Sequence, residues 1–223
     1  YNYGGTIYAC EVYSTLYGHI VAGLTLYNGN NGVIDSCFAG KSFTGRATYN
    51  GTYITSFAYQ ITSGKIVDSL VTANLYCNNT SGWIAGFVGF IPYTSGMFGI
   101  VENCVADVSF NGVGTKYLDV AEDGLLKASQ TTGTIKKCII SSDAEVDGVI
   151  VSEYSESKFL FITIKTYEAG SGPSYIVATN YQLHDFNTYA NPEICDFDIS
   201  RRTDIFTKWY YSDKIEMAVP RAV

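Results

Sequence analysis

The sequence has few charged residues and no long hydrophobic run, and each shortage excludes a class of protein. Charged residues make up 16% of the 223 residues, and the formal net charge is −7. A nucleic-acid-binding surface needs clustered Lys and Arg, which the sequence lacks. The longest apolar run, residues 83–93, contains glycine and proline and is shorter than the roughly 20 residues of a membrane-spanning helix. The sequence therefore predicts no nucleic-acid partner and no membrane span in this stretch of chain.

The composition that remains is typical of a packed, β-rich body. Hydrophobic residues make up 47% of the chain, too many for a disordered segment, and the chain contains 22 glycines, 19 tyrosines and 12 phenylalanines. Ala, Glu, Lys and Leu are too scarce for a coiled coil. Residues 1–100 hold only three acids and three bases, so most of the charge follows residue 100. The chain starts at Tyr1 with no signal-peptide pattern, which favours a piece of a longer protein over a processed one.

A short motif recurs five times in the first 140 residues. Each copy has Gly, then Ile or Val two residues later, then Cys or Ser three residues after that, and the Cys or Ser positions are 27, 32, 35 and 34 residues apart. A motif that recurs at intervals of 27 to 35 residues indicates a repeat protein. The five copies are Gly5–Cys10, Gly32–Cys37, Gly64–Ser69, Gly99–Cys104 and Gly133–Cys138.

The spacing within the motif predicts a corner in the chain. Side chains of a straight strand alternate between its two faces, so residues three apart would point in opposite directions. Ile and Cys both favour burial, and a bend at the two intervening residues lets both face inward. Stacked repeats then form a β-solenoid in which each coil contacts its neighbours. The expected aliphatic column is Ile7, Ile34, Ile66, Val101 and Ile135, and the expected column beside it is Cys10, Cys37, Ser69, Cys104 and Cys138.

A second apolar strip precedes the motif in each repeat, so each repeat is predicted to hold two or three short strands. Turn-forming runs of Asn, Gly, Ser and Thr close these strips. The strips are residues 20–24, 54–57, 83–87 and, more loosely, 125–128.

The repeat resembles the GLUG type found in bacterial surface and secreted proteins, including the non-catalytic part of some IgA-protease-like polypeptides. The resemblance covers about residues 1–140 and 183–223, and it implies a right-handed parallel β-helix. Ser69 in the third repeat departs from the family pattern, and residues 141–182 fit it poorly. The matching positions are Ala22, Gly23, Gly32, Ile34, Ser36 and Cys37; Ala85, Gly86, Gly99, Val101, Asn103 and Cys104; and, in the tail, Leu183, Phe186, residues 196–200, Trp209 and Pro220.

The expected organisation has three parts. Residues 1–140 form about five regular coils, residues 141–182 form degenerate coils, and residues 183–223 form a C-terminal cap over the open end. A cap is expected because an open solenoid end exposes a sheet edge and a section of the core.

The six cysteines contain no CxxC spacing, and the favoured interpretation is inward-facing thiols that act as small hydrophobic residues. A disulfide between Cys10 and Cys37 is sterically conceivable, because adjacent coils lie about 4.8 Å apart. Cys77 and Cys195 fall outside the column and are either separate buried thiols or a pair.

The two histidines, His19 and His184, lie near no other group of metal-ligating residues in the sequence, so no histidine-based site is expected. Asp35 and Glu102 occupy the same corner position two coils apart, about 9–10 Å by the strand spacing, which is near the upper limit for an inverting glycosidase pair. Val67 lies between them, so catalysis there is not favoured.

An acidic segment has the spacing of the start of a calcium loop. Asp143, Glu145 and Asp147 are followed by Gly148, but Tyr154 stands where an EF-hand has its closing Glu. A solvated acidic turn is the favoured interpretation. Sequons begin at Asn50, Asn78 and Asn79, and they carry glycans only if the source is eukaryotic.

The sequence predicts a non-enzymatic structural or adhesive module of an extracellular or surface-exposed protein, without cofactor. Tyrosines on its faces suit glycan or surface-protein contacts, or lateral and homo-oligomeric packing. Two alternatives stay open: a receptor-binding β-helix on a virion surface, such as a phage tail spike, and a polysaccharide lyase or hydrolase.

Overall fold

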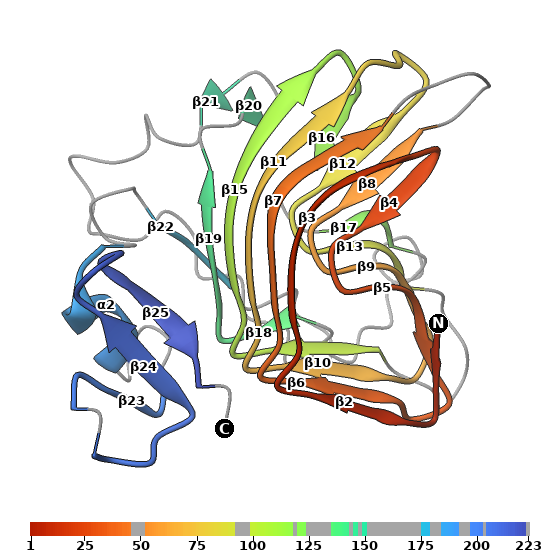
Figure 1. Cartoon of the computed structure of the whole chain (residues 1–223). Helices are drawn as coiled ribbons and strands as arrows, with labels where there is room; N and C mark the ends of the chain where they lie inside the picture. Colours follow the sequence, from red (N-terminus) through yellow and green to blue (C-terminus); the bar gives the residue numbers. More distant parts are fainter. Residues whose placement is uncertain are drawn as a thin grey trace.

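The protein is described here from a computed structural model (Figure 1). The structure describes residues 1–45, 52–91, 99–117, 120–123, 135–142, 145–146, 149–150, 175–178, 184–191, 197–202 and 204–221. Within these residues it is all-β apart from the short helix α2, Phe186–Ala190.

Four parallel sheets make up the main body, and the chain visits them in a fixed order (Figure 1). Each circuit of the chain adds one strand to each of the four sheets. We call the sheets B, C, D and A, in the order in which a circuit reaches them. The first circuit consists of β2 (Thr6–Tyr8), β3 (Glu11–Gly18), β4 (Ile20–Ala22) and β5 (Thr25–Gly29), and β1 (Asn2–Tyr3) precedes it in sheet A. The parallel sheets of the fold prediction are therefore confirmed.

Later circuits repeat these four strands in the same order. The second holds β6 (Val33–Asp35), β7 (Phe38–Gly45), β8 (Tyr53–Thr55) and β9 (Ala58–Ile61). The third holds β10 (Lys65–Val67), β11 (Leu70–Cys77), β12 (Trp83–Ala85) and β13 (Val88–Ile91). The fourth holds β14 (Ile100–Glu102), β15 (Val105–Gly112), β16 (Thr115–Tyr117) and β17 (Val120–Asp123). Then β18 (Ile135–Lys136) joins sheet B, while β19 (Cys138–Ser142) and β22 (Tyr175–Ala178) join sheet C.

The strand register of sheet B aligns the expected aliphatic column. Ile7 pairs with Ile34, Ile34 with Ile66, Ile66 with Val101, and Val101 with Ile135. The chain then turns sharply before it enters sheet C, because the residue ahead of each Cys or Ser has a left-handed backbone. These corner residues are Ala9, Ser36, Asp68, Asn103 and Lys137, with φ between 47° and 55°.

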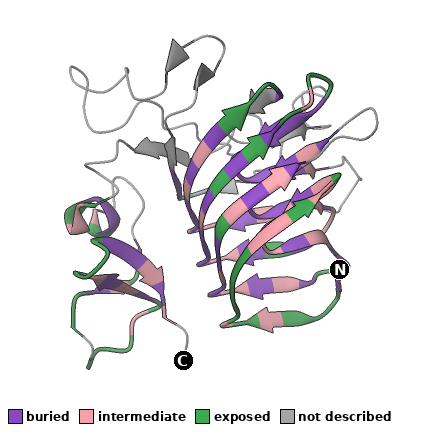
Figure 2. Ribbon diagram, turned by 45° about the horizontal axis from the view of Figure 1, so that its top comes forward, coloured by how far each residue is buried: buried purple, intermediate pink, exposed green. Residues whose placement is uncertain are grey.

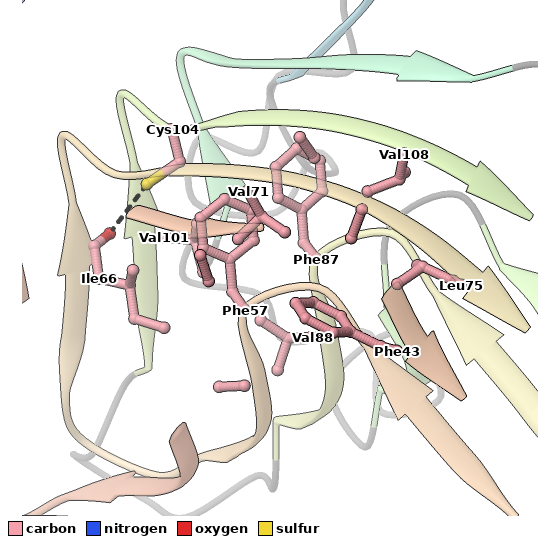
Figure 3. Packing of buried hydrophobic residues seen from close by; sticks show 14 of the residues in the cluster. Phe43, Phe57, Ile66, Val71, Leu75, Phe87, Val88, Val101, Cys104 and Val108 are labelled. Atoms are coloured by element: carbon pink, nitrogen blue, oxygen red, sulfur yellow. Dashed lines mark hydrogen bonds between the residues drawn. The ribbon is translucent and has the colours of Figure 1, made fainter. Parts of the chain in front are cut away.

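The core lies inside the four sheets (Figures 2 and 3). Phe43 and Leu75 pair in the register of sheet C, and both are fully buried. Phe57 and Phe87 stack at 5.6 Å between ring centroids where sheet D meets sheet A. These large side chains fill the space between facing sheets. Apolar residues that recur once in each repeat of the sequence predict such an arrangement.

The fourth strip differs from its prediction. Sheet D takes β16, whose Thr115 pairs with Trp83, as its fourth strand. The sequence predicts this strip at residues 125–128 instead, and those residues lie outside the described part of the chain. The register of β12 pairs it with residues 115–117.

The described residues from 184 onward form a separate unit, here called the C-terminal unit, of α2, β23 (Ile199–Ser200), β24 (Trp209–Ser212) and β25 (Met217–Pro220). Their apolar side chains pack on Leu70, Val105 and Ile139 of sheet C. Leu70 and Val105 are the first residues of β11 and β15, and Ile139 is the second residue of β19. The neighbours Val71, Ala106 and Ile140 face the main core, so the C-terminal unit covers the outer face. The contacts place it beside sheet C, whereas the sequence predicted a cap across the open end.

The region expected to hold degenerate coils is described only in part. β20 (Glu145–Val146) and β21 (Val149–Ile150) pair antiparallel, and β22 adds a parallel strand beside β19. No helix in the described part of the chain is long and apolar enough to cross a membrane.

Candidate functional site

At four of the five corners of the stack a side-chain donor satisfies a local carbonyl. The thiol of Cys37 donates to the Asp35 carbonyl at 3.2 Å, and the thiol of Cys104 donates to the Glu102 carbonyl at 3.3 Å. The hydroxyl of Ser69 makes the same bond to the Val67 carbonyl at 2.8 Å. The bond spans the left-handed residue, because it joins the side chain to the carbonyl two residues earlier. Cys and Ser can both donate this hydrogen bond at the corner.

Burial of this column increases away from the first circuit. Cys10 is exposed, whereas Cys37, Ser69, Cys104 and Cys138 are buried. Cys104 also donates to the Ile66 carbonyl of the preceding circuit at 3.6 Å (Figure 3). Desolvation raises the pKa of Cys37 and raises that of Cys104 well above its ordinary value. The Cys37 and Cys104 thiols are therefore protonated donors near neutral pH and poor nucleophiles.

The cysteines that the structure describes are free thiols, so Cys10 and Cys37 form no disulfide here. Cys77 is buried at the end of β11, in register with Gly45 and Gly112. A Cβ on either Gly82 or Gly114 would lie 2.8 Å from its sulfur, so glycines make room for this thiol. Cys195, its candidate partner, lies outside the described residues.

Asp35 and Glu102 occupy the same register position in sheet B, but they are not on adjacent strands. Asp35 pairs with Val67 and Val67 with Glu102, so two strand spacings separate the acids. Among the residues that the structure describes, no three His, Cys, Asp or Glu side chains gather where a metal ion could bind.

The remaining candidates lie apart from one another. Glu145 begins β20, and the other two residues of the calcium segment, Asp143 and Asp147, lie outside the described residues. His184 contacts the Glu216 carbonyl through Nδ1 at 2.9 Å. Of the sequon residues, Asn78 is exposed, Asn79 is half-buried, and Asn50 lies outside the described part of the chain.

Aromatic side chains gather on the outside of sheets D and A, a feature that the sequence analysis missed. Ile54 and Ile84 belong to the core, so their strand neighbours Tyr53 and Trp83 face outward. The same alternation turns Tyr59 outward beside the core residue Ala58. We call Tyr53, Tyr59, Trp83 and the exposed His19 the aromatic cluster.

The rings of the aromatic cluster lie against one another. The Tyr53 and Trp83 centroids are 4.8 Å apart, and Tyr59 stacks on Trp83 at 6.1 Å with 6° between the ring planes. His19 lies 5.9 Å from Tyr53. Tyr53 and Tyr59 are half-buried, while Trp83 is 7% exposed beneath them.

Two polar atoms in this region have no hydrogen-bond partner. They are Nε1 of Trp83 and Oγ1 of Thr55, both buried. Thr55 lies one strand position from Ile54 and shares the outward face of β8 with Tyr53. A buried polar atom without a hydrogen-bond partner costs free energy, and such atoms are uncommon in folded proteins. The aromatic cluster therefore combines half-buried ring faces with two polar atoms that are buried beneath them and have no partner.

The sequence did hold a signal for this cluster. When residues 54–57 are aligned with the last four residues of the strip 83–87, Tyr53 falls at the same position as Trp83. Tyr59 follows the first strip by two residues. A repeat alignment that included residues outside the strips would have placed the two rings in adjacent coils.

Exposed tyrosines elsewhere concentrate on the first circuit. Among the exposed large hydrophobic side chains, Tyr76 is the tyrosine from a later circuit. The others are Tyr1 and Tyr3, which precede the first circuit, and Tyr8, Tyr13 and Tyr17 within it.

Comparison with protein-family models, with curated proteins and with solved structures found no match to this chain.

Proposed function

We propose that the chain is a non-enzymatic structural and adhesive β-solenoid module of an extracellular or surface-exposed protein. In this proposal the four parallel sheets are a right-handed parallel β-helix of the GLUG type. The repeat motif, the corner residues and the shared register support the architecture. The separation of Asp35 from Glu102 by Val67 supports a binding role over glycoside cleavage.

The observation that carries the binding role is the aromatic cluster, in which the half-buried rings of Tyr53 and Tyr59 lie against Trp83. One face of a pyranose ring presents C–H groups, which pack on aromatic rings, while its hydroxyls accept hydrogen bonds. Tyr53 and Tyr59 supply half-buried ring surface, and the Trp83 indole packs beneath these two rings. We therefore propose a glycan as the ligand of this cluster. The net charge of −7 favours a neutral glycan over an acidic one, because like charges repel.

Intrinsic fluorescence tests this proposal, because the chain has two tryptophans and Trp209 is fully buried in the C-terminal unit. Cellohexaose and chitohexaose are the neutral probes, and a hyaluronan hexasaccharide is the acidic one. We expect a saturable change of Trp83 emission with a neutral probe. Tyr53→Ala or Tyr59→Ala should weaken binding at least about tenfold, as loss of a stacking anchor does.

The matched control is Tyr76→Ala, because Tyr76 is an exposed tyrosine on β11, away from the cluster. It should leave the titration unchanged. The proposal is wrong if no probe changes the emission, or if Tyr76→Ala and Tyr53→Ala weaken binding equally. Release of reducing ends from any probe would overturn the non-enzymatic assignment.

A further inference from the structure

The first circuit, together with β1 ahead of it, leaves one edge of every sheet in the main body open. β1, β2, β3 and β4 are the terminal strands of sheets A, B, C and D. On its outer side each of these strands has backbone N–H and C=O groups with no strand beside them. All four open edges face the same end of the stack, here called the N-terminal edge (Figure 1).

Residues that are buried in later circuits are exposed at this edge (Figure 2). Val12 is 38% exposed, whereas Ala39, its register partner in sheet C, is fully buried. Cys10 is exposed, whereas the equivalent Cys37 is 1% exposed. Leu16 is half-buried opposite the fully buried Phe43. The N-terminal edge therefore presents a cross-section of the core.

The edge lacks the features that usually prevent strand addition. Natural edge strands carry Lys, Pro or inward-pointing charges that discourage pairing. Residues 1–34 contain no lysine, arginine or proline, and Glu11 is their only charged side chain. Tyrosines on this circuit, such as Tyr13 at 73% exposure, add apolar surface instead. An open edge of this composition indicates an interface.

We propose that the N-terminal edge accepts a further circuit of parallel strands built on the chain's own repeat. Such a circuit would place Ile or Val opposite Ile7, then a left-handed corner residue, then Cys or Ser opposite Cys10. This row continues the pairing seen between Ile7 and Ile34 on the other side of the first circuit. The proposal rests on the solenoid architecture proposed above and is independent of glycan binding.

Other occupants fit the edge less well. A single strand from an unrelated protein would pair with one of the four open edges and leave three. A second copy meeting this edge head to head would run its circuit in the opposite sense. The three-residue β2 and the eight-residue β3 could not then both meet their equivalents around the corner. A circuit with the same spacing and direction satisfies all four sheets.

The test adds one circuit to the full chain. A copy of residues 5–31 is joined directly to Gly5 in place of residues 1–4, so that the copy leads into Gly5 as residues 5–31 lead into Gly32 in the natural chain. The copy carries Cys10→Ser, which leaves the original Cys10 as the reporter. Iodoacetamide labelling under native conditions is followed by peptide mass spectrometry, which reports Cys10 separately from the other cysteines.

We expect labelling of the original Cys10 to slow at least about tenfold, toward the rate of Cys37, because a stacked circuit buries it. The melting temperature should rise by several degrees. A matched control carries Ile7→Asp and Val12→Asp in the copy, at positions that face the core, and it should restore fast labelling of Cys10. Far-UV circular dichroism monitors the fold of each variant.

Unchanged Cys10 labelling in an extended protein that keeps its β spectrum would overturn the proposal. Equal protection by the Asp-bearing copy would also overturn it, because shielding would then not depend on stacking. Light scattering of the natural chain provides a third result. Self-association that protects Cys10 in proportion to concentration would show that a second copy takes the edge, which contradicts the proposal. The titration of the aromatic cluster separates each of these failures from a failure of glycan binding.

Discussion

Asp68 binds two residues of the C-terminal unit from across 140 residues of sequence. Its carboxylate accepts from Lys208 Nζ at 2.5 Å and from Trp209 Nε1 at 3.3 Å. The Asp68 side chain is 3% exposed, the Lys208 side chain is 55% exposed, and Trp209 is fully buried. Asp68 is also the left-handed corner residue of the third circuit, with φ of 47°. One residue therefore turns the chain between sheets B and C and holds the C-terminal unit against the stack.

We expect Asp68→Ala to destabilise the contact between sheet C and the C-terminal unit by about 1–3 kcal/mol. The change leaves Trp209 Nε1 buried without an acceptor, and it removes a side chain tolerated in the left-handed region. Asp68→Asn keeps an oxygen for Trp209 and favours the corner, so its cost should be smaller. Urea unfolding in a Trp83→Phe background, where Trp209 alone fluoresces, measures both. Equal costs for Asn and Ala would show that the acceptor does not hold the unit.

The Lys208 side of this contact should contribute little by itself. The bond to Asp68 raises the pKa of Lys208, but a half-exposed ammonium is screened by solvent. Because the pKa is raised in the folded state, the contribution is present below the ordinary value of 10.5 and is lost as the pH rises through the folded pKa. Lys208→Met should therefore cost under about 1 kcal/mol at pH 7. Its deficit relative to the natural chain should shrink above pH 10.5 in matched urea titrations.

The repeat and its corner could be predicted from the sequence because they follow from one short-range rule. Ile and Cys three residues apart cannot both face inward from a straight strand, and five copies of that conflict indicate a bend. The position of the C-terminal unit could not be predicted in this way. Its apolar residues, such as Trp209 and Phe197, would suit an end or a side of the stack equally. Placement depends on the outward Leu70, Val105 and Ile139, whose orientation becomes clear only once the register is known.

Replacing Cys104 with Ser tests whether the corner needs a donor or a sulfur. Ser69 already makes the corresponding bond in the adjacent circuit. We expect Cys104→Ser to keep the bond to the Glu102 carbonyl and to cost less than Cys104→Ala, which leaves that carbonyl without its side-chain donor. The difference should be about 1 kcal/mol in urea unfolding at pH 7. A larger loss for Ser than for Ala would show that apolar packing of the sulfur dominates.

We also expect the natural chain and Cys104→Ser to differ in how their stability depends on pH. Burial raises the pKa of Cys104 well above the ordinary value of 9.0, so the folded state holds this proton more tightly than the unfolded state does. The stability that this provides is complete below pH 9 and is lost as the pH rises toward the folded pKa. The natural chain should therefore lose more melting temperature than Cys104→Ser between pH 8 and pH 10. Parallel curves for the two proteins would contradict the assignment of a protonated, buried thiol.

The aromatic cluster lies so close to Gly89 that no side chain fits at this position. A Cβ at this position would lie 2.3 Å from Cη2 of Trp83 and 2.8 Å from the Tyr59 carbonyl oxygen. Gly89→Ala should therefore displace the indole, at a cost of about 1–3 kcal/mol for overpacking. The near-UV circular dichroism of the stacked rings should weaken, and affinity for the neutral glycan probe should fall with it. Gly5→Ala is the matched control, because its Cβ would meet only Asn2 Oδ1 within 4 Å, at 3.2 Å. If Gly89→Ala reduces stability and leaves both the ring signal and the glycan titration intact, Trp83 is not part of the binding surface.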